Sequence, residues 1–298
     1  MKSATLVLFI IGFHVSLAFK ICAFNVKSFG EAKAANKQVM DILIKIISRC
    51  DVCLIQEVRD SKGEAVRVLI EGLNRFDKLH NYTFLGSERL GRNSYKEQYV
   101  FIFRSDVVQV RAFYQYPSTT KGDSDTFSRE PFIAWFHSPH TAVKDFVLIA
   151  QHTSPKDAVR EIDELFKVFE SVKERWKTQN IMFLGDLNAA CSYVTAKDWE
   201  SIRLRKHPNF YWLIGDEEDT TVSEKTHCAY DRIVVHGKEF LNGIIVKSAK
   251  PFNFKKKYRL SEEDVGSFVV CFTIYTDRPA CIVTAWQLQI VQVSHECP

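Results

Sequence analysis

The stretch Ile181-Met182-Phe183-Leu184-Gly185-Asp186-Leu187-Asn188-Ala189 begins as an apolar, strand-like run and ends abruptly in polar residues. Because side chains alternate along a strand, Asp186 and Asn188 are expected to point to the same side. Polar sites of α/β proteins assemble at the ends of such strands, where paired oxygen ligands hold metals or phosphates. The sequence Gly-Asp-x-Asn is also ordinary turn chemistry, so this motif alone leaves a simple turn open.

Four other segments also join an apolar run to a polar residue. They are Lys20–Asn25, Asp51–Glu57, Phe146–His152 and Cys228–Val235. One polar residue at the end of a buried strand is most often a cap or a solvated rim. Five such endings together supply two amides, three acids and a histidine. This set suits a hard cation such as Mg²⁺, a phosphate group and proton transfer.

The spacing of apolar residues predicts many strands and few helices. Strands are expected at 20–25, 51–57, 82–87, 99–104, 132–137, 146–151, 181–184, 210–214 and 231–235, and helices at 33–49, 64–75 and 156–177. Three helices are too few to surround a barrel, so we predict an α/β fold: a two-sheet α/β/α sandwich with helices on the outer faces. No repeat, low-complexity tract or linker divides residues 19–265, which we expect to form one domain.

The chain opens with Lys2, an apolar run from Leu6 to Leu17 and the small-residue end Ser16-Leu17-Ala18. This pattern is typical of a signal peptide over residues 1–18 that is removed before Phe19. No later segment approaches the roughly 20 apolar residues that a membrane-spanning helix needs. We therefore predict a secreted protein that passes through the endoplasmic reticulum and has no stable membrane association.

Six segments of the chain match motifs of a known family. They are Ala23–Val26, Gln56–Asp60, Leu90–Tyr99, Phe127–Pro131, Gly185–Ala189 and Cys228–Arg232. From Phe19 to about Val265 the chain resembles the deoxyribonuclease I-like members of the endonuclease/exonuclease/phosphatase superfamily. The Leu90–Tyr99 segment separates deoxyribonucleases from the lipid phosphatases and apurinic-site nucleases of that superfamily, and the γ-type branch of the family is the most similar.

The resemblance implies a deoxyribonuclease I-like fold and a secreted, metal-dependent endodeoxyribonuclease that hydrolyses DNA phosphodiester bonds and leaves 5′-phosphates. It implies Mg²⁺ or Mn²⁺ as the catalytic metal, Ca²⁺ as a stabilising metal and DNA as the partner, and we expect a monomer. The net charge is only +4, so a local groove rather than the whole surface would attract DNA. Actin binding, which some family members show, is not implied.

Phosphodiester cleavage needs charge neutralisation at the phosphate, a base for the attacking water and an acid for the leaving 3′ oxygen. By the resemblance, the metal ligands are Asn25, Glu57 and Asp186, and the catalytic residues are Glu97, His152, Asp186, Asn188 and Asp231. His152 is implied to be the general acid, and Glu97 to orient its ring and raise its basicity.

The resemblance also implies binding residues outside this catalytic set. DNA contacts are implied for Arg59, Tyr95, Arg129 and Asn188. A surface ion pair stays open as the role of either arginine. Partial matches to calcium loops of the family contain Asp125, Glu130 and Asp219, although acidic loops are usually just solvated.

The cysteines divide into two kinds by their surroundings. Cys22, Cys50 and Cys53 lie in or beside apolar strand segments, so we predict buried free thiols. Cys191 and Cys228 flank the loop-rich stretch next to Asp186 and Asp231. In a secreted protein a bridge there would remove about 4 kcal/mol of unfolded-chain entropy, and the resemblance implies the same pairing.

The chain departs from the family at its C-terminal end. There the family has a Ser-Asp-His segment, whose histidine Asp231 would orient, near the positions that Val269-Val270-Cys271 occupy here. Residues 266–298 contain no lysine and only three charged residues, which indicates a divergent tail of different coding origin in place of the last core strand region.

The divergent tail still has strand character. Ser267–Tyr275 is β-rich and apolar, and Trp286–Ile290 alternates apolar residues with glutamines. We expect the tail to fill the last core strand without supplying an imidazole to Asp231. The chain as written is then an impaired endonuclease; the alternative is a non-catalytic relative that binds DNA or a protein.

Overall fold

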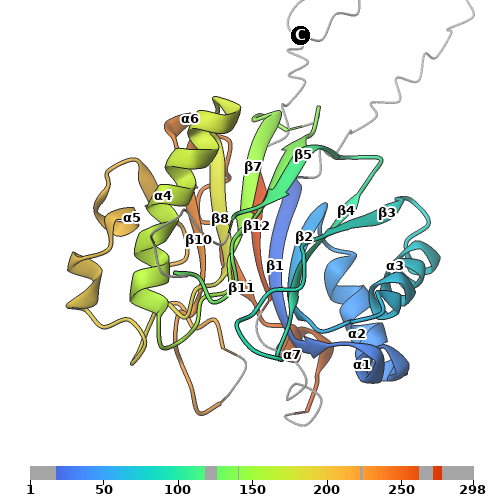
Figure 1. The fold of residues 1–298 in the computed structure, drawn as a ribbon. Coiled ribbons are helices and arrows are strands. Elements are labelled where there is room, and N and C mark those ends of the chain that lie inside the picture. The colour runs from blue at the N-terminus through green and yellow to red at the C-terminus, as the bar shows by residue number, and fades with distance from the viewer. Residues whose placement is uncertain (1–17, 118–125, 140, 222–223, 262–270, 277–298) are drawn as a thin grey trace, which may run out of the picture.

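The structure is a computed structural model that describes residues 18–117, 126–139, 141–221, 224–261 and 271–276. Two six-stranded sheets face each other (Figure 1). The first contains, in spatial order, β11 (Lys250–Phe252), β12 (Cys271–Thr276), β1 (Phe19–Phe29), β2 (Val52–Val58), β4 (Gln98–Arg104) and β3 (Tyr82–Gly86). The second contains β5 (Gln109–Gln115), β6 (Phe132–His137), β7 (Asp145–Ala150), β8 (Ile181–Asp186), β10 (Asp231–His236) and β9 (Phe210–Trp212).

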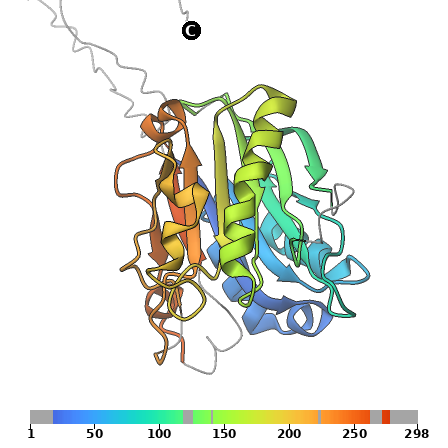
Figure 2. The same ribbon diagram turned by 60° about the vertical axis from the view of Figure 1, so that its left-hand side comes forward.

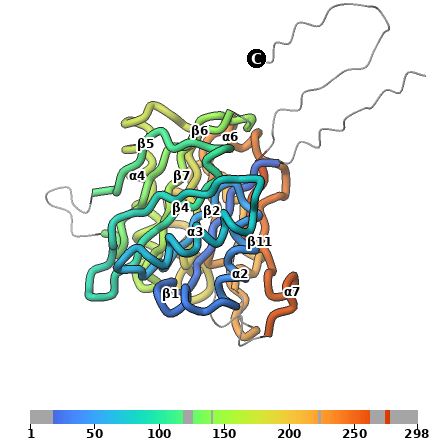
Figure 3. Tube along the Cα trace, turned by 90° about the vertical axis from the view of Figure 1, so that its right-hand side faces the viewer, coloured from blue at the N-terminus to red at the C-terminus, as the bar shows by residue number. Residues whose placement is uncertain are grey.

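Helices cover the outer face of each sheet. On the first sheet lie α1 (Glu31–Ala35), α2 (Lys37–Ile47) and α3 (Glu64–Phe76), of which α2 and α3 stand in front of β2 and β4 in Figure 3. The long helix α4 (Ala158–Trp176) covers the second sheet, as Figure 2 shows. The remaining elements are short: η1 (Asp198–Glu200), α5 (Arg203–Lys206), α6 (Lys238–Asn242) and α7 (Phe254–Tyr258).

The core between the sheets is rich in phenylalanine. Phe101 of the first sheet stacks on Phe132 and meets Phe136 edge-on, with ring centroids 6.0 and 5.5 Å apart. Such offset and edge-to-face pairs add to the gain from burying the rings. This two-sheet arrangement, with one helical layer on each outer face, confirms the predicted sandwich.

All nine predicted strands occur in the described chain, within a few residues of their expected bounds. The helix expected over 33–49 is two helices, because the Asn36 side chain accepts a hydrogen bond from the Val39 amide and so caps α2 separately from α1. Strands β5 and β11 were not predicted from the sequence. Strand β5 has no buried residue, and β11 is very short.

Residues 271–276 of the divergent tail form a core strand, as predicted. β12 pairs antiparallel with β1, from Phe19 opposite Thr276 to Phe24 opposite Cys271, and lies between β1 and β11. The expected second run, Trp286–Ile290, lies outside the described residues, and so does the expected signal peptide except Ala18. None of the helices in the described ranges is long and apolar enough to cross a bilayer.

The disulfides confirm one prediction about the cysteines and overturn another. Cys191 and Cys228 are bonded, as expected. The prediction that Cys22 and Cys50 are free thiols is wrong, because they form a second disulfide with their Cα atoms 6.1 Å apart. Cys50 follows the end of α2 and thereby comes to lie over β1, a proximity that spacing in the sequence does not reveal. Cys53 is a buried free thiol, as predicted.

Candidate active site

One amide joins the two sheets at the centre of the candidate site. The Asn25 side-chain nitrogen of β1 donates to Oε1 of Glu57 at 2.9 Å and to Oδ2 of Asp186 at 3.3 Å. Glu57 belongs to the first sheet and Asp186 to the second. All three side chains are buried or nearly so, and the two carboxylates therefore meet at one place between the sheet ends.

A second side-chain amide, that of Gln56, also links the two sheets next to Asp186. Gln56 donates to the Gln151 carbonyl at 2.8 Å and accepts from the Asp186 amide at 3.0 Å. Gly185 makes the close approach possible, since its φ is +134° and a Cβ there would lie 2.3 Å from the Gln151 carbonyl oxygen and 2.6 Å from Gln56 Nε2. The glycine in the opening motif is therefore required by two close contacts, one with the backbone that follows the neighbouring strand β7 and one with the Gln56 side chain of the other sheet.

Glu57 has a backbone conformation that is unusual for its residue type. Its φ of +57° lies in the left-handed region, which costs a non-glycine residue energy and marks functional positions when the surroundings enforce it. Its Oε2 accepts from the Ser28 amide at 3.1 Å and from the Tyr95 hydroxyl at 3.5 Å. The Arg59 guanidinium lies 4.0 Å from the centre of the exposed Tyr95 ring. Two of the predicted DNA contacts therefore lie together beside Glu57.

His152 and Glu97 form a buried pair next to Asp186. His152 Nδ1 lies 2.7 Å from Glu97 Oε1, and its Nε2 lies 3.9 Å from Asp186 Oδ2. Burial and the Arg129 charge oppose the protonated ring, but Glu97 and Asp186 outweigh them and raise the pKa of His152. Burial alone would raise the pKa of Glu97, whereas His152 and Arg129 together hold it below its usual value. The pair therefore favours an imidazolium beside a carboxylate.

Arg129 contacts both members of this pair and holds them in position. Its Nε donates to the His152 carbonyl at 2.9 Å and lies 3.0 Å from the same Glu97 oxygen that faces the ring, while Nη2 donates to the Thr153 carbonyl at 2.8 Å. Only 14% of its side chain is exposed. Its predicted contact with DNA stays a prediction, and these bonds add a positioning role that the sequence did not suggest.

Glu161 is a buried carboxylate that sequence reasoning missed. It lies on α4 and accepts from the Ser128 amide at 3.1 Å, the Gln151 side chain at 3.3 Å and the Ser154 amide at 3.3 Å. Burial raises its pKa. It therefore ties the loop that carries Arg129 to the segment that carries His152. The available signal was an acid on the apolar face of the helix, among Ala158, Ile162 and Leu165.

The turn after β8 holds Asn188 against its neighbours. Asn188 has a φ of +47°, so strand alternation does not extend to it, and its amide donates to Asp186 Oδ1 at 3.0 Å. Its side chain donates to the Thr153 carbonyl at 3.0 Å. Both the turn and the site suggested by Gly-Asp-x-Asn are therefore present, and the expectation that alternation alone aligns the two side chains is wrong.

Asp231 lies opposite Asp186 across the β8 and β10 pairing. Its amide donates to the Thr220 hydroxyl at 3.0 Å, and that hydroxyl donates to the Cys228 carbonyl. Within the described ranges, neither oxygen of the fully buried Asp231 carboxylate has a hydrogen-bond partner. Burial, followed by the charge of Asp186, raises the pKa of Asp231 well above its usual value. The other four predicted catalytic residues thus lie around Asp186, with Glu97 reaching it through His152.

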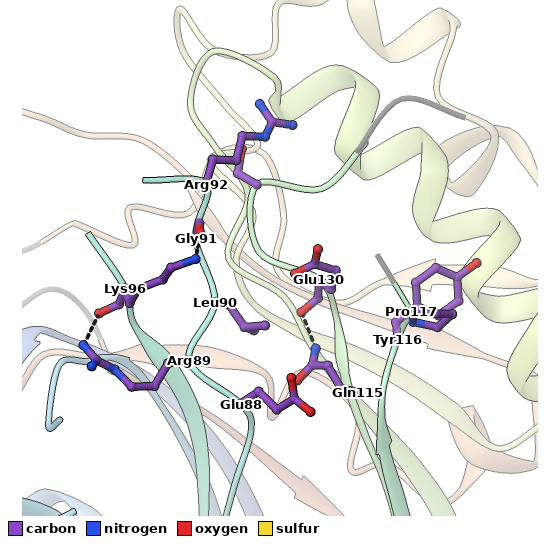
Figure 4. Close-up of a pocket in the computed structure, with 11 residues that line it drawn as sticks. Glu88, Arg89, Leu90, Gly91, Arg92, Lys96, Gln115, Tyr116, Pro117 and Glu130 are labelled. Carbon is purple, nitrogen blue, oxygen red and sulfur yellow. Dashed lines mark hydrogen bonds between the residues drawn. The ribbon is translucent and has the colours of Figure 1, made fainter. Parts of the chain in front are cut away.

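A charged pocket of about 430 Å³ lies beside the site (Figure 4). It is lined from one side by the loop that precedes Glu97, where Lys96 donates to the Gly91 carbonyl, and from the other by Gln115 and Glu130. Of the predicted calcium ligands, only Glu130 lines this pocket. Asp125 is outside the described residues, and the Asp219 carboxylate is engaged by Thr221 and His227.

The donor set around Asn25 fits a magnesium-type ion in its chemistry. Glu57 and Asp186 offer carboxylate oxygens side by side, and Mg²⁺ binds proteins through one or two carboxylates while keeping water or phosphate oxygens as its other ligands. In the part of the chain that the structure describes, no group of three or more His, Cys, Asp or Glu side chains is arranged to hold a metal. A two-carboxylate site completed by substrate is compatible with that finding.

The chain belongs to the endonuclease/exonuclease/phosphatase family, whose model matches residues 22–249. It is 51% identical to human deoxyribonuclease gamma over 280 residues, which cover 92% of each chain, and 48% identical to horse deoxyribonuclease-1 over 251 residues, which cover 84% of this chain and 88% of that one. Among solved structures, it resembles a family protein from Leptotrichia buccalis with a TM-score of 0.62 at 17% identity, covering 87% of this chain and all of that one. The latter likeness concerns the fold alone.

Proposed function

We propose that this protein is a secreted, divalent-metal-dependent endodeoxyribonuclease that hydrolyses phosphodiester bonds of DNA and leaves 5′-phosphates. The observation that carries the proposal is the junction at Asn25, where Glu57 and Asp186 meet within reach of a histidine braced by Glu97. Carboxylates for a hard cation beside a proton donor are the groups that phosphodiester hydrolysis needs. The high identity to deoxyribonucleases supports DNA as the substrate.

Asn25, Glu57 and Asp186 would hold the catalytic Mg²⁺ or Mn²⁺. When bound, the ion neutralises charge that develops on the phosphate oxygens. Asn25 orients both carboxylates through its amide hydrogens, and Asn188 presents its side chain from the turn that Asp186 organises. For Ca²⁺ we propose a stabilising role at the loops of Asp125, Glu130 and Asp219, separate from the catalytic ion.

His152 would protonate the leaving 3′ oxygen. Its Nδ1 faces Glu97, so Nε2 is the atom directed toward Asp186 and the substrate side. Glu97 fixes the ring orientation and favours the protonated form, which is the form that a general acid needs near neutral pH. Arg59 and Tyr95, which lie together beside Glu57, would contact the DNA backbone and minor groove.

Among the described residues, the Asp231 carboxylate has no hydrogen-bond partner. By the family resemblance it would orient a second histidine. A missing general base costs about 10² to 10⁴ in rate. We therefore propose that the chain is an impaired nuclease. The same observation favours a second candidate, a relative that binds DNA or a protein partner without cleaving it.

Two disulfides support the proposed secretion. Cys22–Cys50 and Cys191–Cys228 would be reduced in a cytosolic protein but persist in the oxidising secretory pathway. We propose that the secreted protein is a monomer.

The test is nicking of supercoiled plasmid by the purified chain in Mg²⁺ and in EDTA. We expect slow nicking in Mg²⁺ only, lost in Asp186→Asn and kept in the matched control Asp41→Asn, whose acid lies exposed on α2. Binding of the chain to DNA without nicking in Mg²⁺ would favour the non-catalytic candidate. Nicking by Asp186→Asn at the wild-type rate would contradict the proposed site.

A further inference from the structure

The segment Asn81-Tyr82-Thr83 is the single Asn-x-Ser/Thr sequence of the chain. It lies where β3 begins, and β3 is the edge strand of the first sheet. Asn81 is exposed, and its interactions with other described residues run through its backbone rather than its side chain. The side-chain amide nitrogen that a glycan would modify is therefore at the surface and available.

The backbone around Asn81 is held firmly in place. Its amide donates to Asp106 Oδ1 at 2.9 Å, and its carbonyl accepts from the Ser105 amide at 2.8 Å. The next side chain, Tyr82, is buried, and its hydroxyl donates to Asp77 at 2.8 Å and accepts from Arg104 at 2.9 Å. Because these anchors do not use the Asn81 side chain, a glycan could be attached without removing any of them.

Three large apolar side chains are exposed close to Asn81 in the sequence. Phe76, Leu79 and Phe84 are 56%, 87% and 38% exposed, and all three lie within eight residues of each other around the sequon. They border an edge strand, in which the Asn74 side chain already bonds the backbone amide and carbonyl of Tyr82. Only the part of the edge beyond Tyr82 can pair with another chain. An exposed apolar edge of this kind promotes aggregation unless something covers it.

From these observations we infer that Asn81 carries an N-linked glycan that covers the β3 edge and the apolar side chains beside it. The inference rests on the proposed passage through the secretory pathway, where such glycans are attached. It adds a modification site that the proposed nuclease activity does not require.

The glycan would lie far from the catalytic residues. Tyr82 pairs with Arg104 at one end of β4, whereas Glu97 precedes Gln98 at the other. At about 3.3 Å per residue, the length of β4 separates the two ends by about 20 Å. Loss of the glycan is therefore expected to leave DNA cleavage unchanged.

To test for the glycan, the full chain is expressed in cultured animal cells. Protein from the medium and from the lysate is then treated with peptide N-glycosidase F. We expect a faster-migrating band after treatment and the conversion of Asn81 to aspartate in its tryptic peptide. Asn81→Gln and Thr83→Ala should each give the faster band without treatment. Asn209→Gln, which changes another exposed asparagine outside any sequon, should behave like the wild type.

The outcomes separate this inference from the proposals on which it rests. An unmodified Asn81 in protein from the medium overturns the glycan and leaves secretion and nuclease activity standing. An unmodified chain confined to the cytosol overturns both the glycan and the proposed secretion.

The shielding role has a separate test in the secreted proteins. Asn81→Gln should form more aggregate on concentration than Asn209→Gln, with an unchanged plasmid nicking rate. Adding Leu79→Lys to Asn81→Gln should reduce the aggregation, because a charge in place of the most exposed of the three apolar side chains interrupts the apolar surface. Equal aggregation of Asn81→Gln and Asn209→Gln would overturn the shielding role.

Discussion

Asp231 lies directly opposite Asp186 in the antiparallel pairing of β10 with β8, and no described residue donates a hydrogen bond to its carboxylate. The side chain is fully buried. Burial without a donor is costly for a carboxylate, and a second carboxylate nearby increases the cost. The fold thus holds an acid at the centre of the candidate site in a setting that opposes its ionisation.

Replacing Asp231 by asparagine is expected to stabilise the metal-free protein at neutral pH. Its folded-state pKa is raised, mainly by burial and then by Asp186, so the folded state binds the proton more tightly than the unfolded state does. Stability therefore falls as the pH rises above the unfolded pKa of about 4. One pKa unit corresponds to about 1.4 kcal/mol, so Asp231→Asn should gain at least about 1 kcal/mol at pH 7.

Thermal unfolding in EDTA at several pH values measures this effect. The gain of Asp231→Asn should shrink toward pH 4, where the wild-type carboxyl is protonated in both states. A lower melting temperature for Asp231→Asn at pH 7 would mean that the carboxylate has a donor after all.

Glu97 is expected to set the pH range in which His152 acts as an acid. The carboxylate raises the pKa of His152, so Glu97→Gln should lower it and move the alkaline fall of kcat to lower pH. His152→Ala should reduce nicking by about 10² to 10⁴ at pH values below the alkaline fall, where the wild-type ring is protonated. His137→Ala is the control, since that ring pairs with Asp145 away from the site. An unshifted pH profile in Glu97→Gln would refute the assigned role.

Glu161 should be necessary for the placement of Arg129 and His152. The Glu161 carboxylate accepts hydrogen bonds from the Ser128 amide, the Gln151 side chain and the Ser154 amide, so Glu161→Gln turns its amide group toward at least one of these donors. We expect a loss of about 1 to 3 kcal/mol in the free energy of unfolding, together with slower nicking. Glu164→Gln on the same helix, where the partly buried acid pairs with Lys167 and Arg203, should change neither by as much. Equal effects of the two variants would exclude the positioning role.

The Cys22–Cys50 disulfide is expected to contribute substantially to stability. Its cysteines are 28 residues apart, and a loop of that length corresponds to about 3 to 4 kcal/mol on the chain-entropy estimate. Denaturant unfolding of the double variant Cys22→Ser/Cys50→Ser measures the loss. Non-reducing peptide mapping provides the direct check: it should recover Cys22 linked to Cys50 and Cys53 unlinked. A Cys22–Cys53 peptide would contradict the pairing.

The parts of the fold that the sequence predicted are those in which local pattern and burial agree. The apolar runs that form β1, β2, β7 and β8 are buried almost throughout, so their apolar composition was enough to predict them as core strands. β5 was missed because it is never fully buried. The family motifs located the site residues, since each motif lies at the start or the end of a strand.

The remaining features depend on contacts between distant segments. The Cys22–Cys50 bond arises because α2 returns the chain over β1, and nothing local distinguishes Cys50 from Cys53. Similarly, the joint contact of Arg129 and His152 with Glu97 needs three separate segments to meet. Distances of this kind follow from tertiary packing and leave no periodic trace in the sequence.

The central claim is that a nuclease site is present whose Asp231 lacks its partner. The most direct test compares plasmid nicking by the chain and by Val269→Ser/Val270→Asp/Cys271→His, which restores the family's Ser-Asp-His segment, at equal folded concentrations in Mg²⁺ and Ca²⁺. We predict nicking that is about 10² to 10⁴ faster in the restored variant, with the gain lost when Asp231→Asn is added. Equal nicking rates for the chain and the restored variant would contradict the account.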